Sequence, residues 1–209
     1  MKSVAALDQV VRYALGVLAV GLDEEAGAVS VTGTADQLAV ADWMFPLLDR
    51  RPEDSQRNPL REHKFENLQD TLQIAYVPEQ TSPQEMQEFT VGLRVIADNH
   101  YVFGVPVTNA VVFRGPDLTL EDWLLQTVNS TGPAEPYGEP GSRDQARIFR
   151  IRTADPDAVR NILVELRATA GIIRCVAFPS KHSIAVRGTE REVDLAEKII
   201  ARLDLPAPR

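Results

Sequence analysis

Cysteine is almost absent from this chain of 209 residues, in which Cys175 is the only one. One cysteine cannot form an internal disulfide, so a small disulfide-stapled scaffold is excluded. Cys175 lies in an apolar segment with Ile172, Ile173 and Val176. We therefore expect it to be buried as a small apolar side chain without a chemical role.

Long apolar runs are also missing. The longest one near the N-terminus spans residues 10–22, is interrupted by Arg12 and is too short to cross a bilayer. Asp8, Gln9 and Arg12 break the continuous apolar region that a signal peptide requires. The sequence therefore predicts neither a transmembrane segment nor a signal peptide in this numbering.

The motifs of common enzyme and cofactor sites are absent as well. No GxxxxGKS/T, GxGxxG, GxSxG or HExxH pattern occurs. The three histidines, His63, His100 and His182, fall in predicted connecting segments without a second ligand or base at a suitable spacing. We therefore expect no catalytic residue, metal site, cofactor or small-molecule substrate, and we predict that the protein is not an enzyme.

Positive charge is scarce in the first two thirds of the chain. The formal net charge is −8, but residues 143–209 carry +4 and the remaining residues carry −12. A net acidic chain argues against a general nucleic-acid binder, whose affinity depends on neutralising phosphates. The separation of charge instead indicates that the basic part meets an acidic protein surface.

What the sequence does contain is an internal repeat. A shift of 73 residues gives seven identities in 33 positions without a gap, and a shift of 155 residues brings up a third copy. The repeat predicts three related modules, at residues 1–52, 70–130 and 144–206. Residues 53–69 and 131–143 have the polar, proline-containing composition of linkers.

The third module has the clearest local pattern. Residues 147–152 alternate between apolar and basic side chains, as in a half-buried strand, and residues 155–156 supply a helix N-cap followed by proline. The β-prone segments 172–178 and 183–187 then form a hairpin, and a helix follows over 190–203. The order β-α-β-β-α predicts an α+β fold in which each module packs two helices on one face of a three-stranded sheet and leaves the other face in water.

The first module lacks the strand that opens the other two. We expect two helices, over residues 2–14 and 35–49, and between them two strands, over 17–22 and 28–32. Pro46 should kink the second helix or end it early. Because a sheet without one strand leaves an exposed edge, we hypothesise that another segment or another subunit supplies the strand by strand addition.

Three arginines of the third module form the one candidate binding site. By alternation, Arg150, Arg152 and Arg187 share the sheet face away from the helices, whereas Arg147 belongs to the other face. Such a face can bind an acidic protein surface or a nucleic acid, and KH-type modules contain similar elements. RNA binding by KH-type modules depends on a GXXG loop between adjacent helices, and none of the three modules contains such a loop. We therefore favour a protein partner or self-association, with a KH-like nucleic-acid-binding protein as the alternative.

Two segments of the third module follow a known pattern. Residues 182–188 read HSIAVRG and residues 200–206 read IARLDLP, and parts of the first segment recur at 108–115 and 29–34. In these segments the chain resembles the repeated N-domains of bacterial secretins, the outer-membrane channels of type II and type III secretion and type IV pilus systems.

The resemblance implies periplasmic protein–protein interaction modules that stack into rings beneath the channel. We therefore expect a non-enzymatic scaffold protein that forms a ring or oligomer as part of a bacterial secretion or pilus system. The periplasmic localisation follows from the resemblance alone, and the cytoplasm is the alternative.

Overall fold

The computed structural model describes residues 10–12, 19–23, 25, 28–65, 69–130, 135–139 and 141–204. The chain divides into two compact units. The first unit holds residues 1–90 and 99–118, and the second holds residues 91–98 and 119–209. Helix α3 (Pro83–Ile96) therefore contributes its first part to one unit and its last part to the other.

Two antiparallel sheets build the first unit. The smaller sheet pairs β1 (Ala19–Asp23) with β2 (Ala28–Thr32). The larger sheet has four strands in the order β3-β4-β6-β5, and every neighbouring pair is antiparallel. The bounds of these strands are β3 Leu60–Lys64, β4 Thr71–Tyr76, β5 Val102–Val105 and β6 Ala110–Gly115.

The described part of the first module follows the expected order. Residues 10–12 are helical, whereas the rest of the helix expected over 2–14 and the start of the strand expected at 17 lie outside the described residues. Among the residues that the structure describes, β2 pairs with β1 on one side and with no strand on the other. The strand-addition hypothesis for that edge stays a prediction.

Helix α2 (Ala35–Asp49) begins with a capping box. The Thr34 hydroxyl accepts from the Gln37 N–H at 3.3 Å, and the Gln37 side chain accepts from the Thr34 N–H at 2.8 Å. Pro46 does not end the helix early, since the helix continues to Asp49 and the N–H of Arg50 bonds to the Pro46 carbonyl at 3.2 Å. Proline has no backbone N–H, so at this position in the last turn the helix loses only one hydrogen bond.

The linker expected over residues 53–69 is wrong in part, because Leu60–Lys64 forms strand β3. This strand pairs with β4, so the second sheet has four strands instead of the expected three. Its sequence, LREHK, is polar. Edge strands carry charged side chains because one of their sides is open to solvent, and such a strand has the same composition as a linker.

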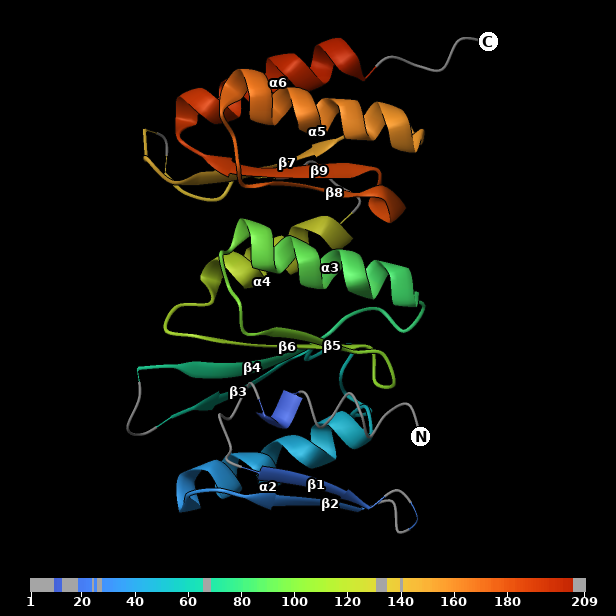
Figure 1. Ribbon diagram of the computed structural model, residues 1–209, viewed down its shortest axis with the longest axis vertical. Coiled ribbons are helices and arrows are strands. Elements are labelled where there is room, and N and C mark those ends of the chain that lie inside the picture. The colour runs from blue at the N-terminus through green and yellow to red at the C-terminus, as the bar shows by residue number, and fades with distance from the viewer. Residues whose placement is uncertain are drawn as a thin grey trace. The chain divides into compact units, whose positions relative to one another are not determined.

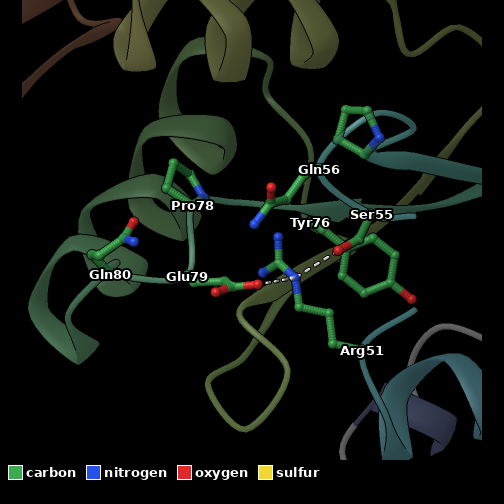
Figure 2. A pocket seen from close by; sticks show the side chains of 8 residues that line it. Arg51, Ser55, Gln56, Tyr76, Pro78, Glu79 and Gln80 are labelled. Carbon is green, nitrogen blue, oxygen red and sulfur yellow. Dashed lines mark hydrogen bonds and ion pairs between the residues drawn. The ribbon is translucent and has the colours of Figure 1, made fainter. Parts of the chain in front are cut away.

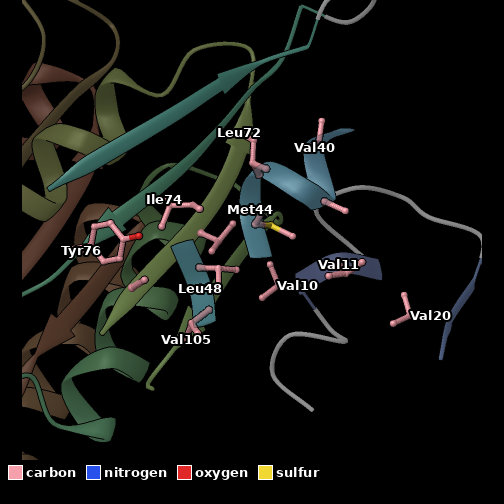
Figure 3. Close-up of a cluster of buried hydrophobic side chains, with 13 residues drawn as sticks. Val10, Val11, Val20, Val40, Met44, Leu48, Leu72, Ile74, Tyr76 and Val105 are labelled. Atoms are coloured by element: carbon pink, nitrogen blue, oxygen red, sulfur yellow. The ribbon is translucent and has the colours of Figure 1, made fainter. Parts of the chain in front are cut away.

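One hydrophobic core joins α2 to the four-stranded sheet (Figure 3). Figure 1 shows α2 lying between the two sheets of the first unit. The buried side chains of this core from α2 and the larger sheet are Val40, Ala41, Met44, Leu48, Leu72, Ile74, Tyr76, Val105, Ala110 and Val112. The expectation that each sheet leaves one face in water is therefore wrong here, because α2 of the first module covers that face of the larger sheet. A module of about 50 residues is marginally stable alone, and this contact buries more apolar surface.

The opposite face of the larger sheet packs against the first part of α3. Met86 and Phe89, which lie three residues apart on one side of this helix, are both buried. Gly104 of β5 lies so close to Met86 that a Cβ at this position would collide with its side chain. The larger sheet is thus covered on both faces.

The second unit contains the third module in the expected β-α-β-β-α order. Its three antiparallel strands lie in the order β7-β9-β8, and Figure 1 shows both helices on the same face of this sheet. The bounds are β7 Gln145–Arg150, α5 Pro156–Ala170, β8 Cys175–Phe178, β9 Ser183–Gly188 and α6 Glu190–Leu203. The predicted α+β fold class is therefore confirmed.

Local signals define both helices of this module. The Asp155 side chain accepts from two N–H groups of the first turn of α5, Pro156 is the first helical residue, and Gly171 ends the helix with φ of 67°. α6 begins with a capping box between Thr189 and Glu192. The starts of both helices and the end of α6 therefore lie where the sequence predicts them.

Cys175 lies in the hydrophobic core between this sheet and its helices, where it is 1% exposed. Burial raises the pKa of its thiol, so the neutral form is favoured. Phe149 and Ile151 pack on the same core. The expectation that Cys175 is buried is confirmed.

The second face of the third sheet is also covered. Ile148, Phe178 and Ala185 are buried although they do not belong to the core under α5 and α6. Gly92, in the last part of α3, lies so close to the Phe178 ring that a Cβ there would collide with it. The open face expected for this module is therefore wrong, because residues of the preceding module's helix occupy it.

Truncation of Met44 tests the core that α2 shares with the sheet. We expect Met44→Ala to lower the free energy of unfolding of the first unit by about 2–5 kcal/mol, because the site is fully enclosed. Urea unfolding followed by Trp43 fluorescence in a Trp123→Phe background measures it. The exposed Val164→Ala is the control, and an equal loss in both variants would contradict a shared core.

Candidate functional site

Arg187, at the end of β9, is fully engaged inside the second unit. Its Nε and Nη2 donate to the two carboxylate oxygens of Asp144 at 2.7 and 2.6 Å. Its Nη1 donates to the carbonyl of Ile96, the last residue of α3, at 2.8 Å. The side chain is 16% exposed. A cation at this point satisfies an orphan carbonyl and complements the negative end of the helix dipole.

Arg150, at the end of β7, makes the equivalent contact with α4 (Thr119–Asn129). Its Nη2 donates to the carbonyls of Thr127 and Ser130 at 2.9 and 2.6 Å. Its Nη1 donates to the hydroxyl of Ser183, the residue opposite it on β9, at 2.7 Å. Two of the three candidate arginines therefore bind the C-terminal ends of two helices.

Arg152 and Arg147 lie apart from this arrangement. The exposed Arg152 follows β7, and its backbone N–H donates to both carboxylate oxygens of Asp204 at 2.9 and 2.8 Å. Arg147 forms an ion pair with Glu197 of α6 at 2.9 Å, which confirms that its side chain lies on the helix side of the sheet. The structure thus brings Arg150 and Arg187 to the face away from α5 and α6, as predicted.

The hydrogen bonds between Asp144 and Arg187 stabilise the charged forms of both side chains. The bidentate hydrogen bonds from Arg187 keep the pKa of the Asp144 carboxyl below its usual range, and the same bonds raise the pKa of Arg187. A carboxylate that stays ionised is a poor general acid. The pair has the properties of a structural clamp.

The histidines lie in separate places. His63 packs between the rings of Trp43 and Phe65, at centroid distances of 5.2 and 5.8 Å. His100 is exposed, and His182 occupies the left-handed turn between β8 and β9 with φ of 46°. Within the described ranges no three His, Cys, Asp or Glu side chains gather closely enough to hold a metal ion.

A cavity of about 270 Å³ in the first unit has a half-buried arginine, Arg51, at its wall (Figure 2). The Nε of Arg51 donates to the Ser55 hydroxyl at 2.7 Å, and its Nη1 donates to the Val77 carbonyl at 2.8 Å. Its guanidinium also lies 5.4 Å from the centre of the Tyr76 ring and 3.8 Å from Glu79. The arginine therefore fastens the segment after α2 to the end of β4.

Sequence reasoning missed Arg51 and Asp144 as partners. Arg51 lies beside the boundary expected at residue 52, and Asp144 is 43 positions from Arg187. The repeat held a signal for the second case. Arg114, which aligns with Arg187, pairs with Asp70 at 2.9 Å, and each aspartate directly precedes a strand of its sheet.

The comparisons with known proteins agree with the resemblance found in the sequence. Residues 146–209 match the family model described as the bacterial type II/III secretion system short domain, Secretin_N. No curated protein matches the chain.

Two solved structures of secretins are similar to this chain at low identity. A crystal structure of a dimeric cysteine mutant of the N-terminal domain of the secretin XcpQ from Pseudomonas aeruginosa is 14% identical over 99% of this chain and 77% of that one, with a TM-score of 0.31. The cryo-EM structure of the ETEC pilotin–secretin complex AspS–GspD is 14% identical over 98% of this chain and 35% of that one, with a TM-score of 0.27. The family match covers residues 146–209, so the similarity to the secretin N-domain family is shown for the third module alone.

Proposed function

We propose that this protein is a non-enzymatic scaffold of the secretin N-domain type, which forms a ring or oligomer as part of a bacterial secretion or pilus system. The observation that carries the proposal is the family match of residues 146–209, whose fold is the predicted β-α-β-β-α module. Nothing in the structure or the comparisons favours the nucleic-acid alternative. Periplasmic localisation is part of the proposal, and no described helix is both long enough and apolar enough to cross a membrane.

The proposal gives the three arginines a role in protein contacts. Arg150 and Arg187 bind helix ends of the same chain, which supports a role in holding successive modules together. Arg152 is exposed beyond the end of β7 and is available to a separate protein surface. A scaffold of small modules needs both kinds of contact, because each module is marginally stable alone.

Self-association at two salt concentrations tests the proposed function. We expect the molar mass from light scattering to rise with protein concentration at about 50 mM salt and to fall toward the monomer at about 500 mM, because opposite charges attract over a shorter range in salt. A monomer under all conditions, together with the capture of no secretion-system protein in a pull-down, would contradict the proposal.

Removing Arg187 tests its structural role. We expect Arg187→Met to lower the free energy of unfolding by about 1–3 kcal/mol, since the Ile96 carbonyl and the Asp144 carboxylate lose a charged donor. Urea unfolding measures the change. Arg160→Met is the matched control, because Arg160 forms an exposed i,i+3 pair worth little.

The Asp144 carboxylate of the same pair makes the free energy of unfolding depend on pH. The folded pKa of Asp144 lies below its unfolded value, so its stabilisation is complete above the unfolded pKa of about 3.9 and is lost as the pH falls through the folded pKa. We therefore expect Asp144→Asn to be less stable than the parent at neutral pH and the gap to close in acid. Unfolding curves over this range measure it, and a gap that is constant with pH would exclude the clamp.

A further inference from the structure

A second cavity, of about 560 Å³, lies in the second unit, where the end of α3 meets the third module. Its basic side chains, Arg94, Arg174 and Arg187, outnumber its acidic ones, Asp98 and Glu192. The remaining residues that line it are Val95, Gly171, Ile172, Ile173 and Gly188. Arg187 is bonded to Asp144, so the arginines that the cavity presents toward solvent are Arg94 and Arg174, beside an apolar wall.

The wall of this cavity includes an unusually exposed apolar side chain. Ile173 is 83% exposed, the highest value among the large apolar side chains of the described residues. Val91, one helical turn before Val95 on α3, is exposed as well. Arg174, next to Ile173, is 44% exposed although it pairs with Asp98 at 2.8 Å. Apolar surface beside accessible arginine is typical of protein contact sites.

The first unit presents a surface of complementary chemistry. Leu38, Asp42, Pro46 and Asp49 lie at spacings of four, four and three residues, which places them on one face of α2, and all four are exposed. Residues 13–49 contain six acidic residues and no lysine or arginine. This outer face of α2 is therefore acidic and carries one large apolar side chain.

We propose that the outer face of α2 in one copy of this chain docks at the Ile173 cavity of a second copy. The inference rests on the proposed function and names the surfaces through which self-association occurs. Leu38 of the first copy covers Ile173 of the second, and Asp42 and Asp49 lie against Arg94 and Arg174.

The two surfaces are different, so the contact is heterologous. Each copy keeps one unused α2 face and one unused cavity after pairing, and further copies add until a ring closes or a filament grows. This property separates the proposed contact from a two-fold contact, in which the same surface meets itself.

Complementary charge reversals test the contact. Asp42→Lys reverses a charge on the α2 face, and Arg174→Glu reverses a charge at the cavity. Sedimentation velocity at low salt measures the assembly. We expect each variant alone to associate at least about tenfold more weakly than the parent. In a mixture of the two variants the unchanged surfaces meet each other, and the two reversed surfaces are again opposite in charge, so we expect association to return toward that of the parent.

Glu53→Lys and Arg160→Glu are matched controls, because both side chains are highly exposed outside the proposed contact and change the charge by the same amount. Ile173→Asp should weaken association as Arg174→Glu does. If the parent associates and the two charge reversals do not weaken it, or the mixture associates no more strongly than either variant alone, the inference fails and the proposed function stands. A monomeric parent that binds a secretion-system protein likewise overturns the inference alone, whereas a monomer without a partner overturns both.

Discussion

An ion pair between an arginine near the end of a central strand and an aspartate just before a neighbouring strand holds one end of two of the sheets. It occurs twice, as Arg187–Asp144 and as Arg114–Asp70. In each sheet the residue after the arginine is a glycine, which pairs with the first residue of the strand that follows the aspartate. The pair therefore fixes the register of the two strands at one end of the sheet. A charge-assisted hydrogen bond holds the strand ends more firmly than uncharged side chains would.

In the third module Arg187 also makes a second contact, with the end of helix α3. Because the Asp144 carboxylate holds the guanidinium in a fixed plane, its third nitrogen points at the Ile96 carbonyl. Arg150 serves α4 in the same manner. Cations that appear in the sequence as a basic face are thus largely used to neutralise helix ends, which costs less than desolvating a charge without a partner.

Periodicity and capping signals predict the local elements of the third module because those signals are contained within a few residues. Asp155, Pro156 and Thr189 mark helix starts, and the alternation around Phe149 marks a strand. Alternation also places Arg150 and Arg187 on one face. Their partners are carbonyl groups of other helices, and a carbonyl has no sequence signature. Strand β3 was not predicted from the sequence, because an edge strand and a linker share the same polar composition.

The covering of both sheet faces limits how the charge separation along the chain can act. Once the faces are occupied, the +4 of residues 143–209 cannot act as one basic surface, because Arg147, Arg150 and Arg187 are bonded within the second unit. The exposed cations are dispersed, since Arg160 and Arg202 lie on α5 and α6 whereas Arg152 and Arg174 lie in the segments beside the sheet. An attraction between an acidic and a basic part must therefore act through a local contact that also buries apolar surface, since scattered exposed charges contribute little at physiological salt. Among the described residues, the surroundings of Ile173 meet both conditions.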